Sequence, residues 1–136
     1  MIKTFELYPG ITLRCFPDTR FKQGCISVQF VRRMKREEAA LNALIPVVLL
    51  RGCEGSEDLS AITARLDDLY GAAVGALVRR VGDYQTTGLY CNFIQEAYAL
   101  EGDEILAPMM DFLGKLLLRP VLESEAFCAR YVDSEK

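Results

Sequence analysis

The order in which two kinds of hydrophobic periodicity follow each other constrains the fold of this sequence most. Apolar residues alternate with other residues, as in half-buried strands, in residues 11–16 and 24–31 and again in residues 72–81 and 84–94. Each pair of alternating segments is followed by two segments in which apolar residues recur at helical spacing. The sequence therefore predicts elements in the order β-β-α-α-β-β-α-α.

This order predicts an α+β fold with two layers, in which the helices pack on one face of a mainly antiparallel mixed sheet. We expect residues 11–16 to pair with residues 24–31 in a first hairpin. A second hairpin should join residues 72–81 to residues 84–94 through a turn at Gly82, because glycine accepts the backbone angles of tight turns.

The first helix should start in the charged residues 32–38 and run to Leu50, and it contains Pro46. A proline inside a helix removes one backbone hydrogen bond and crowds the preceding turn, at a cost of about 3 kcal/mol. We therefore expect a kink or a restart near Ile45. The later helices are expected over residues 57–70, over residues 104–118 with Asp103 as the N-cap, and from Ser124 onward.

The chain has 136 residues, of which 51% are hydrophobic, and this length suits a single domain over residues 1–136. Its last helical pattern reaches the end of the sequence without a capping signal. We therefore expect residues 1–136 to be a truncated N-terminal portion of a longer domain.

The charge distribution argues against a nucleic-acid ligand. Sixteen Lys and Arg stand against nineteen Asp and Glu, for a net charge of −3, and the basic residues are scattered along the sequence. The longest apolar run, residues 43–50, is far below the roughly 20 residues that a membrane helix needs, and the N-terminus has no secretory core region. We expect a cytoplasmic protein with neither a nucleic-acid nor a membrane partner.

The sequence contains no histidine, the residue that supplies most general bases and transition-metal ligands. Its five cysteines match neither a zinc-site spacing nor a C-x-x-C pair, so reduced and mostly buried thiols are expected. Cys53, beside Arg51, is the one thiol whose surroundings suggest a nucleophile. We expect no cofactor and no bound metal.

Two segments resemble a known family. Residues 44–54 read L-I-P-V-V-L-L-R-G-C-E and residues 66–72 read L-D-D-L-Y-G-A. In that order they are similar to the first domain of the insulinase and pitrilysin-like (inverzincin) zinc peptidases and of the mitochondrial processing peptidases. Resemblance at residues 11–30, 80–83 and 117–127 extends the match over almost the whole chain. It implies the N-terminal portion of a processing peptidase-like domain.

Active members of that family carry an H-x-x-E-H motif on the helix before the basic-glycine pair, where the histidines hold zinc and the glutamate acts as the base. Counted back from Arg51, the three motif positions fall on Ala43, Pro46 and Val47. None of these side chains can bind a metal or transfer a proton. The family's further acidic ligand would fall near Glu135. The resemblance therefore implies an inactive homologue that has lost its zinc site.

The same resemblance implies a role without catalysis. The family's inactive bacterial branch pairs with an active zinc-peptidase homologue, which implies a hetero-dimer (a homo-dimer is the other arrangement), and it is linked to modification of elongation factor P. Family members bind an extended peptide substrate along a sheet edge. Here that edge would include Ala72, Ala73, Val74, Gly75 and Ala76. Two alternatives remain open, namely a peptide-binding scaffold without a peptidase partner and a weak metal-independent hydrolase.

Overall fold

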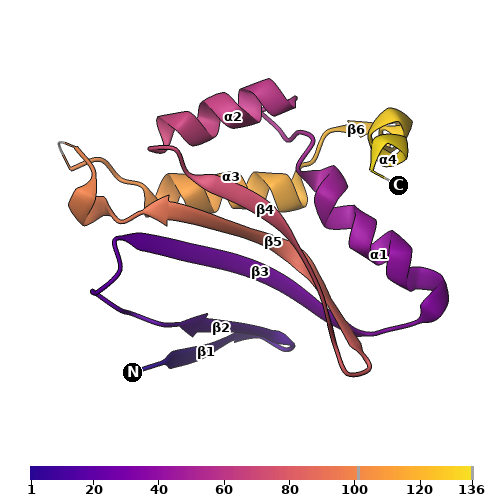
Figure 1. Cartoon of the computed structure of the whole chain (residues 1–136), viewed down its shortest axis with the longest axis horizontal. Helices are drawn as coiled ribbons and strands as arrows, with labels where there is room; N and C mark the ends of the chain where they lie inside the picture. Colours follow the sequence, from indigo (N-terminus) through magenta and orange to yellow (C-terminus); the bar gives the residue numbers. More distant parts are fainter. Residues whose placement is uncertain (101, 136) are drawn as a thin grey trace.

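A computed structural model describes residues 1–100 and 102–135 and confirms the α+β fold (Figure 1). The predicted order of elements is present, with one strand added before the first expected strand and a short hairpin added before the last helix. The elements are β1 (Lys3–Tyr8), β2 (Ile11–Cys15), β3 (Gln23–Arg33), α1 (Arg36–Leu49), α2 (Leu59–Asp68), β4 (Ala73–Val81), β5 (Tyr84–Ile94), the 3-10 turn η1 (Glu96–Tyr98), α3 (Leu106–Leu118), β6 (Leu122–Glu123), β7 (Ala126–Phe127) and α4 (Ala129–Ser134).

The main sheet has the strand order β3-β5-β4, and both of its pairings are antiparallel. The predicted second hairpin is confirmed, since Val81 pairs with Tyr84 across a turn in which Gly82 has a φ of +59°. A left-handed backbone at this position favours glycine. Central strand β5 thus separates β3 from β4, and each outer strand has β5 as its one partner among the described strands.

The predicted first hairpin is wrong in its pairing. Strand β2 pairs with β1, and the two form a separate two-stranded sheet. The reason is the tight turn between them, in which Gly10 has a φ of +83°, whereas the longer segment 16–22 separates β2 from β3. Closing a two-residue connection costs less chain entropy than closing a longer one. The hairpin runs along the side of β3 that lies away from α2 (Figure 1).

The last helix begins later than predicted. Ser124 and Glu125 adopt left-handed φ values of 52° and 65° and form the turn between β6 and β7, so α4 begins at Ala129. Left-handed backbone cannot continue a right-handed helix. Helix α3 begins at Leu106, two residues later than predicted, and Asp103 is not its N-cap. The Glu96 carboxylate instead accepts the N–H groups of Ile105 and Leu106, both at 3.2 Å.

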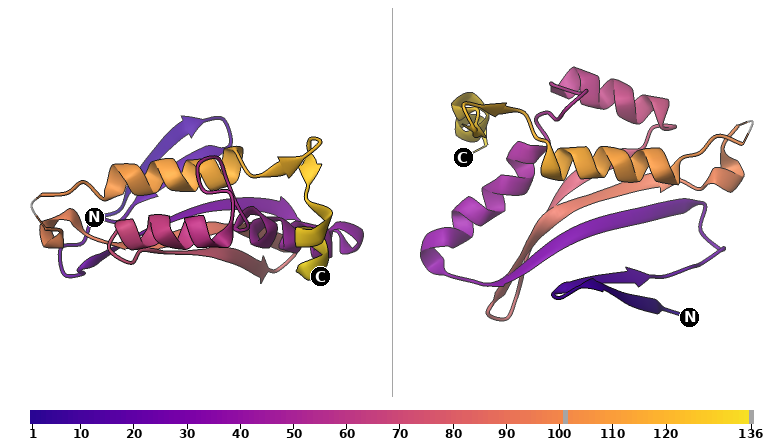
Figure 2. Two further views of the ribbon diagram at one scale, coloured as in Figure 1. Left: turned by 90° about the horizontal axis from the view of Figure 1, so that it is seen from above. Right: turned by 180° about the vertical axis from the view of Figure 1, so that it is seen from behind.

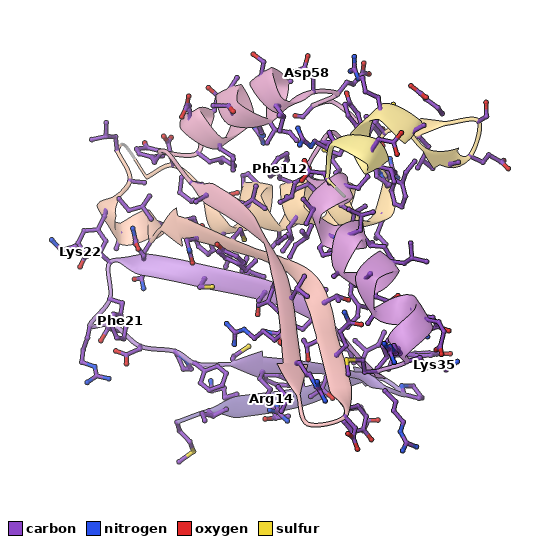
Figure 3. The ribbon with its side chains drawn as sticks, turned by 45° about the vertical axis from the view of Figure 1, so that its right-hand side comes forward. Arg14, Phe21, Lys22, Lys35, Asp58 and Phe112 are labelled. Carbon is purple, nitrogen blue, oxygen red and sulfur yellow. The ribbon has the colours of Figure 1, made fainter. Side chains whose placement is uncertain are left out.

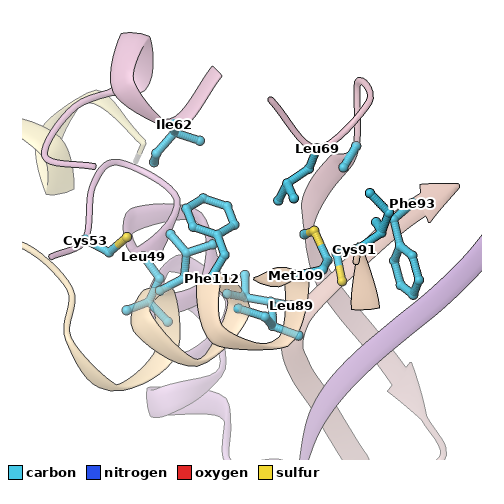
Figure 4. Close-up of a cluster of buried hydrophobic side chains, with 13 residues drawn as sticks. Leu49, Cys53, Ile62, Leu69, Leu89, Cys91, Phe93, Met109 and Phe112 are labelled. Carbon is cyan, nitrogen blue, oxygen red and sulfur yellow. The ribbon is translucent and has the colours of Figure 1, made fainter. Parts of the chain in front are cut away.

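Helices α2 and α3 lie alongside each other over one face of the sheet (Figure 2). Below them, alternate residues of β5 point into the core, where Leu89 and Cys91 are fully buried against Met109 and Phe112 of α3 (Figure 4). Burying each large apolar side chain contributes about 1.5–3 kcal/mol. In residues 1–100 and 102–135, no helix is long and apolar enough to cross a membrane.

Candidate functional site

Helix α1 carries the three positions at which the resemblance places the zinc motif. It runs unbroken from Arg36 to Leu49, so it does not restart near Ile45, and the kink expected there as the other possibility stays a prediction. Pro46 is fully buried, while Ala43 and Val47 are half-buried. No side chain of the three offers a nitrogen or oxygen atom, and the described part of the chain contains no group of three His, Cys, Asp or Glu side chains that could hold a metal.

The polar contacts beside this stretch of α1 are made by amides. The Gln85 side chain of β5 is 5% exposed and donates through Nε2 to the Ala39 carbonyl at 2.8 Å. Its Oε1 accepts from Asn42 Nδ2 at 3.5 Å. A neutral amide satisfies buried backbone groups without offering the charge that a divalent cation requires. Sequence reasoning missed this contact because the two partners are more than forty positions apart.

Glu135 lies against the C-terminal end of α1, where its carboxylate forms an ion pair with the guanidinium of Arg51. Both side chains are largely covered, with 26% of Arg51 and 18% of Glu135 exposed. A cation at a helix C-terminus also interacts favourably with the helix dipole. The carboxylate that the resemblance places nearest to a metal ligand is therefore neutralised by an arginine of this chain.

The structure opposes the alternative of a cysteine nucleophile. Cys53 is fully buried, and its burial raises the pKa of the thiol. Cys91 is also fully buried, and burial raises its pKa to about 11. Because the thiolate is the reactive form, both side chains are inert structural thiols at neutral pH.

Strand β4 contains residues 73–76 of the expected peptide-binding segment and lies at one end of the sheet order. Ala72, just before the strand, is buried and Ala73 is exposed, while the next three residues are half-buried: Val74, Gly75 and Ala76. The outer backbone groups of β4 have no partner strand among residues 1–100 and 102–135. An edge with small side chains allows another extended backbone to approach closely.

Tyr90 of β5 lies across this segment. It pairs in register with Gly75, and a β-carbon at position 75 would come 2.6 Å from Tyr90 Cζ. Glycine is therefore what allows the phenol ring to lie over β4. The ring also lines a pocket on the sheet face away from the helices, together with Cys25, Ser27 and Arg79. Sequence periodicity gave no sign of this pocket.

Comparisons with known proteins support part of the resemblance. No protein-family model matches the chain. It is 27% identical over 127 residues to a protein of Bacillus subtilis (strain 168) named "Probable inactive metalloprotease YmfF", a match that covers 93% of this chain and 30% of that protein. Its fold matches the crystal structure of a conserved protein from Enterococcus faecalis V583 with a TM-score of 0.92, at 23% identity, over 98% of this chain and 31% of that one.

The chain thus spans just under a third of the length of both relatives. Similarity to a protein with that name supports a metalloprotease-like relationship on an inactive branch. The narrower assignment to the insulinase and pitrilysin-like peptidases stays a prediction. So do the single domain over residues 1–136 and the cytoplasmic location.

Proposed function

We propose that this chain is a non-catalytic, metalloprotease-like module that binds an extended peptide along the outer edge of β4 and presents it to a zinc-bearing homologue. The observation that carries the proposal is the composition of α1. Ala43, Pro46 and Val47 occupy the motif positions given by the resemblance, and Pro46 is fully buried among core residues. The similarity to a probable inactive metalloprotease supports the same conclusion.

Peptide binding follows from what α1 and β4 offer together. Strand addition uses main-chain hydrogen bonds, so it needs no catalytic side chain. Hydrolysis by zinc needs at least three protein ligands and an open coordination position. The described part of the chain has an unpaired β4 edge and no group of side chains that could hold zinc. This combination favours binding a peptide over hydrolysing it. The active homologue as partner and the link to elongation factor P come from the resemblance and stay predictions.

A pair of proline variants tests binding at the β4 edge. In an antiparallel edge strand, successive N–H groups point alternately towards the partner strand and away from it. Proline removes one N–H, so one of Ala73→Pro and Val74→Pro breaks the pairing with β5 while the other removes an outward donor. The variant that keeps the native circular dichroism spectrum and melting curve should lose affinity for an unstructured peptide.

Hydrogen exchange locates the bound peptide. Adding the peptide should slow exchange of β4 amides, with no comparable change in the opposite edge strand β3. Protection confined to β3, or an unchanged affinity in the folded proline variant, would contradict the proposal. Co-purification from the native source should then recover a second protein with an intact H-x-x-E-H motif, and recovery of the chain alone would contradict the partner role.

A further inference from the structure

Six exposed basic side chains from three elements gather at one end of the β3-β5-β4 sheet, beside the turn that joins β4 to β5. We call this set the basic tip: Arg32, Arg33, Lys35, Arg36, Arg79 and Arg80. Figure 3 shows Lys35 where α1 begins. The Met34 N–H donates to the Asp83 carbonyl at 2.8 Å, which holds the end of β3 against the β4-β5 turn.

The strand register brings together two short basic runs of the sequence, residues 32–36 and residues 79–80. Arg32 of β3 and Arg80 of β4 both pair with Gln85 of the central strand, so they flank it on one face of the sheet. Arg33 and Arg79 lie on the other face, and their partners are two positions apart along β5. Residues that are more than forty positions apart along the chain thus become neighbours. Two basic segments that are separate in the sequence therefore form one surface in the fold.

The isolated chain only partly neutralises the tip. Glu38 accepts from Arg32 at 2.6 Å and from Lys35 at 3.3 Å. In the part of the chain that the structure describes, no ion pair neutralises Arg33, Arg36 or Arg79. Like charges held close together oppose folding, although each such contribution is small on a solvated surface. The arrangement therefore has a cost that a negatively charged ligand would remove.

The start of α1 adds a second cost. Lys35 is the N-cap of the helix and makes no side-chain capping bond, and Arg36 is the first helical residue. Positive charge is unfavourable at this end, where the helix dipole favours anions and where Ser, Thr, Asp or Asn would cap the free N–H groups. Glu37 and Glu38 in the first turn of α1 offset part of this cost, but Arg36 makes no ion pair within the described residues.

Large apolar side chains lie among these charges. Phe30 is 57% exposed and Tyr84 is 52% exposed, while Val31 and Val81 are 65% and 66% exposed. Protein interfaces are enriched in aromatic residues and arginine, and their apolar contacts gain free energy when water is excluded. The mixture of arginine with exposed apolar groups therefore fits a protein segment better than a purely ionic ligand.

The charge of the whole chain points to the same class of partner. The tip has six basic side chains against the three acidic residues Glu37, Glu38 and Asp83. The remainder of the sequence has ten basic and sixteen acidic residues. A long polyphosphate would be repelled outside the tip, whereas a short acidic segment would meet only the basic surface.

We infer that the basic tip is a docking surface for an acidic, partly apolar segment of a protein partner. Arg79 lines the same pocket as Ala76, but the other five residues of the tip lie outside that pocket, so the inference does not depend on peptide binding at residues 72–76. Electrostatic attraction would speed the encounter, and the exposed aromatic and aliphatic side chains would hold the bound segment.

Fluorescence anisotropy tests this inference with a short labelled peptide in which Glu alternates with Leu, and with a matched peptide in which Gln replaces every Glu. The chain should bind the Glu peptide at least about tenfold more tightly than the Gln peptide, and added salt should remove most of that difference. The double variant Arg33→Gln/Arg36→Gln, which leaves β4 unchanged, should lose the preference. Neither residue makes an ion pair in the described structure, so the melting temperature should be retained.

The double variant Lys22→Gln/Arg130→Gln is the matched control, since it removes the same charge from exposed positions outside the tip. It should keep the preference for the Glu peptide. Equal binding of the two peptides, or an equal loss in the tip and control variants, would overturn the inference. So would a uridine oligonucleotide that binds more tightly than the Glu peptide and loses affinity in the tip variant. Failure of these tests leaves binding at the β4 edge unaffected, because that test uses proline variants of residues 73 and 74.

Discussion

Tyr90 lies directly across Gly75, so close that a β-carbon on residue 75 would come 2.6 Å from Tyr90 Cζ. This contact joins the central strand β5 to the edge strand β4 at the proposed peptide-binding segment. Any side chain at residue 75 would therefore require the Tyr90 ring to move.

Substituting Gly75→Ala should therefore destabilise the fold. In an unobstructed strand, replacing glycine by alanine would raise the free energy of unfolding by about 0.5–1 kcal/mol. The reason is that a chain with alanine has less conformational entropy to lose when it folds. Here the ring must move, and we expect a net loss of about 1 kcal/mol or more in urea unfolding. Adding Tyr90→Ala should relieve the clash, so the two substitutions should not be additive. Additive losses would mean that the ring does not constrain residue 75.

The two neighbouring valines of α1 should respond differently to a charge. Val48 is 5% exposed, whereas Val47 is half-buried. Val48→Asp should cost at least about 2 kcal/mol more stability than Val47→Asp, because only the first leaves an unpaired carboxylate in the core. Thermal unfolding of both variants measures the difference. Equal losses of stability would show that the Val47 side chain is as well shielded from water as that of Val48.

Arg51 and Glu135 should be energetically coupled. Because their ion pair is largely covered, a double-mutant cycle with Arg51→Gln and Glu135→Gln should give a coupling of about 1 kcal/mol, and either single variant should speed amide exchange in α4. The exposed pair of Arg119 and Glu54 is the control, with an expected coupling of below about 0.5 kcal/mol. Indistinguishable couplings would mean that Arg51 does not anchor α4.

Much of the fold follows from the sequence because its signals are local. Alternation on both sides of Gly82 predicted the β4-β5 hairpin, and helical spacing predicted α1 to α3. The errors arose where backbone conformation decides the outcome. At Ser124, a left-handed turn replaces an expected helix start, and the tight turn at Gly10 gives β2 an unexpected partner.

The candidate site was only partly predictable for a related reason. The segment 72–76 could be named from the resemblance, but its place at the end of the sheet depends on strand order. The contacts of Tyr90 with Gly75 and of Arg51 with Glu135 join residues from different elements. Periodicity records which face a residue occupies and carries no information about its neighbour on another strand or helix.

Stability should fall at alkaline pH through Cys91. Its ordinary pKa of 9.0 applies to the unfolded chain, and burial raises the folded value to about 11. Below pH 9 both states hold the proton, so the thiol's contribution to stability is fully present. Between about pH 9 and pH 11 only the unfolded state releases it, and stability falls by up to about 3 kcal/mol. Urea unfolding of Cys91→Ala should show a flatter pH dependence, and identical slopes would contradict this assignment.

Native mass spectrometry of the chain with an unstructured peptide and excess Zn²⁺ determines whether this module holds a peptide and lacks the ligands to cut it. We expect a complex of one chain with one intact peptide, and the same mass after addition of a chelator, because Ala43, Pro46 and Val47 offer no metal ligand. A chain that carries one zinc ion and releases two peptide fragments, with both effects abolished by the chelator, would contradict it.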